Sequence, residues 1–300
     1  MVTATNGIGL RGNRRAGPGV SFAVSRLLPV VLIFGCSHLT RVPRTPALEE
    51  PALEVMTYNL NYGIAGDEAT LQVLAEATAA VVFLQETTPE WERSLRATLT
   101  TTFPHQAYVH HEGAGGLAVL ARRPFELKDV IENQRGWFPA VRVVAQTAVG
   151  PVQAVVVHLR PPVSDSGSWV SGYLTTSPLR RDELKDVLAS LEPNLPTLVA
   201  GDFNEGTSGD ALSELEARGL RSALPEFTPN AKTWGWRVGA FQLSAQLDHV
   251  AYSAQLEPVN ARVVPGGRSD HQAVTATFVR ARKFEDRPAP RGGALSISVR

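Results

Sequence analysis

The chain has 300 residues, of which 43% are hydrophobic and 19% charged, so it can bury a substantial core and is neither disordered nor fibrous. Its formal net charge is zero, but residues 51–280 contain 25 acidic and 18 basic side chains, while both ends of the chain are basic. A body with an acidic excess repels polyphosphate at long range, which disfavours general, sequence-independent binding to duplex nucleic acid.

The first 36 residues have the layout of a lipoprotein-type signal peptide. Four arginines precede the short apolar segment 27–34, and Ile33-Phe34-Gly35-Cys36 resembles a lipobox. This pattern predicts export and acylation of Cys36, which would anchor the mature protein to a membrane facing the periplasm or the cell exterior. Simple secretion and an unprocessed segment are the two alternatives.

The segments on either side of the main body read as unstructured. Residues 37–52, rich in Pro, Thr and Arg, predict a flexible stalk, and residues 281–300 predict a disordered basic tail. Because Cys36 is the single cysteine, no disulfide bond can form within the mature chain.

Between stalk and tail, residues 53–280 alternate strand-like and helix-like segments, which predicts one domain. Helical spacing is found at residues 67–80, 89–101, 180–191 and 209–218. Strand-like runs occupy residues 53–59, 81–86, 107–110, 116–121, 125–131, 141–147, 152–159, 197–200, 247–252, 261–264 and 273–279. Many strands with four helices favour an α+β fold in which two packed sheets are covered by helices.

Polar residues typical of metal or acid–base sites stand at or beside six of these strands. The clearest case is Gly201-Asp-Phe-Asn204, where Asp202 and Asn204 share one face because side chains alternate along a strand. The others are Asn59, Glu86, His158, Asp248 with His249, and Asp270 with His271. Ligands and chemistry gather at strand ends in open sheets, so these residues predict one shared active site.

Seven motifs in this order resemble those of the endonuclease/exonuclease/phosphatase superfamily. They are Thr57-Tyr-Asn59, Leu84-Gln-Glu86, Gly115–Pro124, Val157-His158, Gly201–Asn204, Leu247-Asp248 and Ser269-Asp-His271. The resemblance covers about residues 53–280 and is closest to deoxyribonuclease-like and neutral-sphingomyelinase-like members. It implies a four-layer αββα sandwich, with two packed mixed β-sheets flanked by helices, and divalent-metal-dependent cleavage of phosphate esters.

The metal site is expected at Glu86, because its carboxylate oxygens suit Mg²⁺ or Mn²⁺ and the family holds its metal with the equivalent residue. Asn59 can add a neutral carbonyl oxygen, and Asp270 can complete the set of ligands. Asn61 stands where many nucleases of the family carry an acid, which favours a single ion.

The resemblance also assigns roles to five expected catalytic residues. Asp248 orients His271, and either His271 or Asp202 activates the attacking water. Asn204 donates to phosphoryl oxygens in the transition state, and His158 assists the leaving oxygen or binds the phosphate. His249 is expected to pack in the core or to support the site.

The substrate is a phosphodiester or phosphomonoester of open identity: a nucleic acid, a phospholipid or a small phosphodiester. Trp169, on a loop after the strand ending at His158, and Arg237, in Thr233-Trp-Gly-Trp-Arg237, are candidate substrate contacts, and a purely structural role remains open for both. A deoxyribonuclease-like endonuclease and a catalytically inactive surface binding module are the alternatives to a general phosphoesterase. We expect a monomer.

Overall fold

The computed structural model describes residues 40–282 except residues 134, 165, 169, 170, 173, 174 and 240. The predicted signal peptide with Cys36, the loop residue Trp169 and most of the predicted basic tail therefore lie outside the described residues. Both large sheets, with the helices that cover them, fall within residues 52–280.

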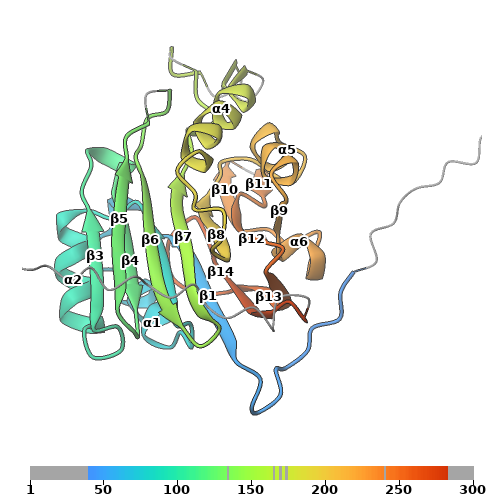
Figure 1. Cartoon of the computed structure of the whole chain (residues 1–300). Helices are drawn as coiled ribbons and strands as arrows, with labels where there is room; N and C mark the ends of the chain where they lie inside the picture. Colours follow the sequence, from blue (N-terminus) through green and yellow to red (C-terminus); the bar gives the residue numbers. More distant parts are fainter. Residues whose placement is uncertain are drawn as a thin grey trace, which may run out of the picture. The chain divides into compact units, whose positions relative to one another are not determined.

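Two six-stranded mixed sheets form the body (Figure 1). The first has the strand order β13 (Leu256–Val264), β14 (Ala273–Arg280), β1 (Ala52–Asn59), β2 (Val81–Gln85), β4 (Leu117–Ala121), β3 (His105–Val109). The second has the order β5 (Phe125–Ile131), β6 (Ala140–Thr147), β7 (Gly150–His158), β8 (Thr197–Asp202), β12 (Asp248–Ser253), β9 (Leu220–Ser222). One parallel pair lies in each sheet, β1 with β2 and β7 with β8, and the remaining pairs are antiparallel.

Helices cover the outer face of each sheet, as Figure 1 shows for α1 and α2 on one side and α4 and α5 on the other. The helices are α1 (Glu68–Ala75), α2 (Pro89–Leu99), α4 (Ser177–Leu188), α5 (Asp210–Ala217) and the short α6 (Leu224–Phe227), with 3₁₀ turns η1 (Tyr62–Ile64) and η2 (Gly113–Gly115). Together these layers form the predicted αββα sandwich.

Strand β4 shows why the central strands read as unbroken apolar runs. Leu117, Val119 and Ala121 face the core between the sheets, whereas Ala118 and Leu120 face the core under α1 and α2. Because both faces of the strand are buried, no polar residue interrupts it.

Helix α2 illustrates the local sequence features that favour a helix: an N-cap residue, a proline in the first turn and regularly spaced apolar residues. Thr88 accepts a hydrogen bond from the Trp91 backbone N–H, and Pro89 occupies the first turn, where its missing N–H costs nothing. Trp91, Leu95 and Leu99 recur at a spacing of four residues and are all fully buried against the first sheet.

Several boundaries differ from the sequence prediction. The first helix ends at Ala75 rather than at residue 80, because the chain then turns to bury Ala77 and Ala79 beneath the sheet. Strand β13 begins at Leu256, earlier than predicted, and β9, α6 and the hairpin of β10 (Trp234–Val238) and β11 (Phe241–Ala245) were not predicted.

Part of the predicted stalk lies against the body. The Arg41 backbone N–H donates to the Glu226 carbonyl, its guanidinium pairs with the Glu226 carboxylate at 2.6 Å, and the Arg44 N–H donates to the Val259 carbonyl. Within the described residues, no helix combines the length and apolar character that a membrane crossing requires.

Candidate active site

Strand register brings three of the expected catalytic residues side by side. His158 ends β7 opposite Asp202 on the parallel strand β8, and Asp202 in turn lies opposite Asp248 on the antiparallel strand β12. In the other sheet, Asn59 ends β1 opposite Gln85 on β2, so that Glu86 follows at the same edge. The ends of four strands and the start of β12 therefore meet at one place, as the sequence predicts.

One carboxylate oxygen, Asp202 Oδ2, lies at the centre of this group. It accepts a hydrogen bond from Asn59 Nδ2 at 3.1 Å, and the Nε2 atoms of His271 and His158 lie 3.5 and 3.6 Å from it. The other oxygen, Oδ1, accepts from the Asn204 backbone N–H at 2.8 Å. Asp202 is 1% exposed, so these contacts rather than bulk water set its orientation.

Asp248 and His271 form a fully buried pair. His271 Nδ1 lies 2.9 Å from Asp248 Oδ2, and the Asp248 backbone N–H donates to Thr233 Oγ1. Burial raises the pKa of Asp248, although the charge of His271 offsets part of that effect. Burial alone would lower the pKa of His271, but the charges of Asp248 and Asp202 outweigh it and raise the pKa to about 10.

His158 is held by a backbone contact that fixes its tautomer. Its Nδ1 lies 3.0 Å from the carbonyl oxygen of Ala114, which can only accept, so Nδ1 carries the proton and Nε2 points toward Asp202. The ring of Phe138 stacks on the imidazole with centroids 4.6 Å apart. These two contacts hold His158 ready to donate to or accept from a substrate oxygen.

Glu86 and its neighbours occupy the first-sheet side of the site. Glu86 Oε1 accepts from Asn59 Nδ2 at 3.0 Å, and Oε2 accepts from the Tyr62 backbone N–H at 3.0 Å. Asn59 thus donates to both Glu86 and Asp202, while its carbonyl oxygen accepts from the Asn61 N–H. The Nδ2 group of Asn59 therefore bridges the two carboxylates, and its Oδ1, the expected metal ligand atom, accepts from the Asn61 N–H.

Asp270 and His271 diverge at the bend where the chain leaves Pro265-Gly-Gly267, as expected for adjacent residues. Asp270 is exposed and accepts from Asn61 Nδ2 and Trp234 Nε1, each at 3.1 Å, whereas His271 is 5% exposed and turns inward. Asn61 therefore donates a hydrogen bond directly to the carboxylate of Asp270, the expected metal ligand.

Backbone strain is concentrated at this edge. Three non-glycine residues of the described chain have positive φ angles, namely Asn61 (60°), Glu86 (59°) and Asn204 (52°), and each follows the end of a strand that contributes to the site. Such conformations cost about 1–3 kcal/mol each and persist where the surrounding structure imposes them, most often at functional sites.

A group of side chains with spacing suitable for a metal ion lies within this cluster. One ligand atom each from Asp202, Asp248 and His271 falls within 4.8 Å of the others, and all three residues are buried. Asp248 Oδ1 is buried without a hydrogen-bond partner. Among the described residues, the expected metal ligands Glu86 and Asp270 do not belong to this group.

The other expected site residues have different surroundings. The Asn204 side chain donates to the Leu159 carbonyl at 2.9 Å, which joins the chain after β8 to the end of β7. Arg237 is exposed on β10, outside the buried cluster. His249 is fully buried between Ser222 Oγ and the Glu205 carbonyl, and burial lowers its pKa to about 4, in line with a supporting role.

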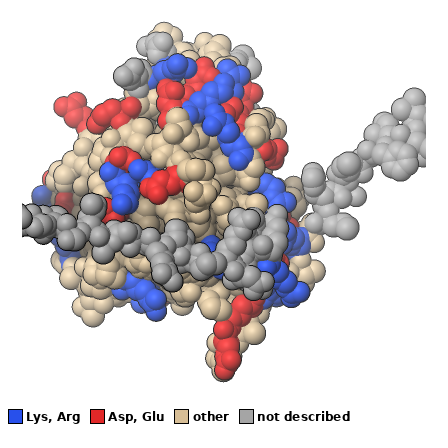
Figure 2. All heavy atoms as spheres, viewed as in Figure 1, with Lys and Arg blue, Asp and Glu red and all other residues tan. Residues whose placement is uncertain are grey.

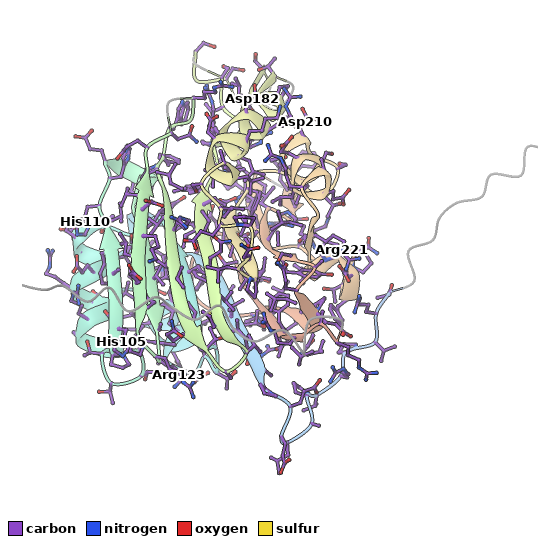
Figure 3. The ribbon with its side chains drawn as sticks, in the orientation of Figure 1. His105, His110, Arg123, Asp182, Asp210 and Arg221 are labelled. Carbon is purple, nitrogen blue, oxygen red and sulfur yellow. The ribbon has the colours of Figure 1, made fainter. Side chains whose placement is uncertain are left out.

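Three groups support the site without having been expected there from the sequence: Thr233, Phe138 and a buried ion pair between Arg180 and Glu205. The ion pair, at 2.8 Å, holds the residue that follows Asn204, and Glu205 also accepts from the Ala211 N–H at the start of α5. Phe138 and Arg180 have no local pattern, because both reach the site from segments outside its sequence motifs, whereas Glu205 directly follows the Gly201–Asn204 motif. His105 begins the edge strand β3 and His110 directly follows it (Figure 3).

Comparison with known proteins finds the same fold in several solved structures. The solved structures that resemble the chain include an endonuclease/exonuclease/phosphatase from Beutenbergia cavernae (19% identity, 77% of this chain and 72% of that chain, TM-score 0.58) and TDP2 from C. elegans (17% identity, 76% and 75%, TM-score 0.56). The catalytic domain of human Nocturnin, solved with a bound sulfate anion, is 18% identical over 77% of this chain and 94% of that chain, with a TM-score of 0.57.

At these identities, the likeness to solved structures shows the fold alone. No curated protein sequence matches the chain significantly. The model of the Endonuclease/Exonuclease/phosphatase family matches residues 56–271, a span that starts in β1 and ends at His271. With most of the domain and the whole buried cluster inside that match, the chain belongs to the endonuclease/exonuclease/phosphatase family.

Proposed function

We propose that the protein is a divalent-metal-dependent phosphoesterase that hydrolyses a phosphodiester, or a phosphomonoester, by attack of water. The observation that carries this proposal is the convergence on Asp202 Oδ2 of His158, His271 and Asn59 at a buried edge shared by both sheets. Two imidazoles on either side of a carboxylate supply the proton acceptor and donor that ester hydrolysis needs.

The residues present fit a divalent cation. Carboxylate oxygens from Glu86 and Asp270 are the hard ligands that Mg²⁺ and Mn²⁺ prefer, and Asp248 Oδ1 is a buried carboxylate oxygen without a partner. We propose Glu86 and Asp270 as the main ligands of one ion, with Asn59 positioned to orient Glu86. When bound, the cation would supply a positive charge that stabilises the developing charge on phosphoryl oxygens.

The protein groups divide the proton transfers between them. Asp202, or His271 in its neutral form, accepts the proton of the attacking water, and Asp248 holds His271 in orientation through Nδ1. A protonated His158, with its Nδ1–H held by the Ala114 carbonyl, donates the Nε2 proton to the leaving oxygen. Asn204 fixes Asp202 Oδ1 through its backbone N–H, which leaves Oδ2 as the oxygen that faces the reaction.

A substrate screen with a ligand variant tests this function. The wild type with Mg²⁺ is assayed on bis-p-nitrophenyl phosphate, p-nitrophenyl phosphate, plasmid DNA and phospholipid vesicles. Glu86→Gln should abolish Mg²⁺-stimulated hydrolysis and change stability by only about 0.5 kcal/mol, because the replacement is nearly isosteric and lies at a strand end. The exposed Glu76→Gln serves as the matched control, and full activity of Glu86→Gln would contradict the site.

The same screen separates the alternatives. Plasmid nicking without turnover of the other substrates would identify an endonuclease, and absence of metal-stimulated turnover on all substrates would favour an inactive binding module. On the face shown in Figure 2, acidic and basic side chains are interspersed over α4 and its surroundings, without a continuous basic surface for a duplex.

We further propose that the protein is exported and anchored by a lipid on Cys36. The basis is the order of arginines, apolar segment and lipobox-like residues before that cysteine. Cys36→Ser should move the protein from the membrane fraction to the soluble fraction. Unchanged fractionation, or no added mass on Cys36 in the wild type, would reject the anchor and leave the enzymatic proposal intact.

A further inference from the structure

The hairpin of β10 and β11 has a surface that the phosphoesterase site does not account for. Its strands pair with each other and not within either six-stranded sheet. Trp236 lies opposite Leu243, and Phe241 lies two residues from Leu243, so these three side chains share one face. They are 46%, 48% and 76% exposed respectively, and Phe241 is the most exposed aromatic side chain among the described residues.

The opposite face and the flanking chain are polar and basic. Arg237 lies opposite Gln242, and Gly235 lies opposite Ser244. From residue 227 to residue 247 the charged residues are Lys232 and Arg237, with no Asp or Glu. This contrasts with the acidic excess of residues 51–280 as a whole, so the hairpin is a locally cationic, amphipathic projection.

The hairpin is joined directly to the active site. Trp234 Nε1 donates to Asp270 Oδ2, and the Gly235 N–H donates to the Asp270 carbonyl at 3.0 Å. Just before the hairpin, Thr233 Oγ1 accepts from the Asp248 N–H. A cavity of about 340 Å³, lined by residues that include Trp234, Gln242, Ser269 and Asp270, lies between the hairpin and the Asp270 segment.

We propose that this hairpin docks on a phospholipid bilayer and presents headgroup phosphodiesters to the site. The substrate class would then be membrane phospholipid. This inference rests on the proposed phosphoesterase function. An exposed face of aromatic and aliphatic side chains stabilises contact with acyl chains, and basic side chains beside it complement the headgroup phosphates. Leu243 on this face favours a lipid over stacked bases, because an aliphatic side chain offers no ring for stacking.

The test uses residues 38–300, which contain both sheets and all three core clusters, so that the N-terminal apolar segment does not contribute to binding. Flotation with phosphatidylcholine–phosphatidylglycerol vesicles measures binding, and Mg²⁺-dependent release of headgroup phosphate measures vesicle hydrolysis. Phe241→Ser/Leu243→Ser is compared with Leu127→Ser, a change of the same kind at a side chain 40% exposed on β5.

The double variant should bind vesicles and hydrolyse their phospholipid about tenfold or more weakly, because two large apolar side chains no longer leave water. Its turnover of soluble bis-p-nitrophenyl phosphate should stay within about twofold of the wild type, since neither residue touches the buried cluster. Leu127→Ser should match the wild type in all three measurements.

Three outcomes would overturn the proposal. In the first, the double variant binds vesicles as well as the wild type does. In the second, the double variant keeps vesicle binding but loses binding to a fluorescent single-stranded oligonucleotide. In the third, the wild type binds vesicles and hydrolyses the soluble diester but does not hydrolyse phospholipid. If the wild type hydrolyses no ester at all, the phosphoesterase function fails, and the flotation result still decides whether the hairpin binds membrane.

Discussion

At the residue scale, Asp248 and His271 form a buried pair, in which the carboxylate is 0% exposed and its Oδ2 lies 2.9 Å from Nδ1 of the imidazole. We expect Asp248→Asn and His271→Ala each to lower kcat/KM by about 10²–10⁴ and the double variant to be scarcely worse, since residues that act together are strongly non-additive. Steady-state kinetics on bis-p-nitrophenyl phosphate measures this. Losses that simply multiply in the double variant would show that the two act separately.

His158 is expected to act on the leaving oxygen, because its Nδ1 proton is held by the Ala114 carbonyl and Nε2 faces the centre of the site. His158→Ala should therefore lose most activity on alkyl phosphodiesters, whose leaving groups are poor, and less on p-nitrophenyl diesters, whose leaving group departs without a proton. Kinetics on a matched pair of diesters tests this. Equal losses on both would remove the leaving-group role.

At the element scale, the parallel pairing of β7 with β8 depends on Gly201. Its φ angle is 149°, and a Cβ at this position would lie 1.9 Å from the Val157 carbonyl oxygen. Gly201→Ala should lower the free energy of unfolding by about 3 kcal/mol or more, because it combines backbone strain with a steric clash, and should displace Asp202 from His158. Urea denaturation measures the loss. Gly206→Ala is the control, since its nearest contact would be at 3.7 Å, and equal effects of the two substitutions would contradict this account.

At the scale of the whole molecule, stability should depend on pH through Glu183, a buried residue of α4. Burial raises its pKa to about 7, against an ordinary value of 4.5, so the folded state holds the proton more tightly than the unfolded state. The stabilisation is fully present below about pH 4.5 and is lost as pH rises to about 7, with a total of at most about 3 kcal/mol. Glu183→Gln, which stays neutral, should match the wild type near pH 4.5 and exceed it near pH 8.

Urea denaturation of both proteins across this pH range measures the difference. Asp186→Asn, at a half-exposed position on the same helix, is the control and should leave the pH profile unchanged. Parallel profiles for Glu183→Gln and the wild type would show that Glu183 is not the group that titrates.

The sequence alone determined the layered architecture and most of the strand-end residues that form the site. A strand that is buried on both faces, such as β4, is recognisable in the sequence because all of its side chains are apolar. Polar residues that follow such an apolar run mark the end of the strand. Asp202 and Asn204 could be placed on one side from the two-residue period of a strand. These features depend on neighbours along the chain, which a single sequence displays directly.

Only the tertiary structure decided how those residues contact one another. The meeting of Asn59, His158 and His271 at Asp202 Oδ2 depends on the register of β7 with β8 and on the packing of one sheet against the other. The stacking of Phe138 on His158 and the exposed face of the β10–β11 hairpin likewise involve segments without a local signal. Contacts between residues far apart in sequence are set by the packing of the whole chain, so no short motif encodes them.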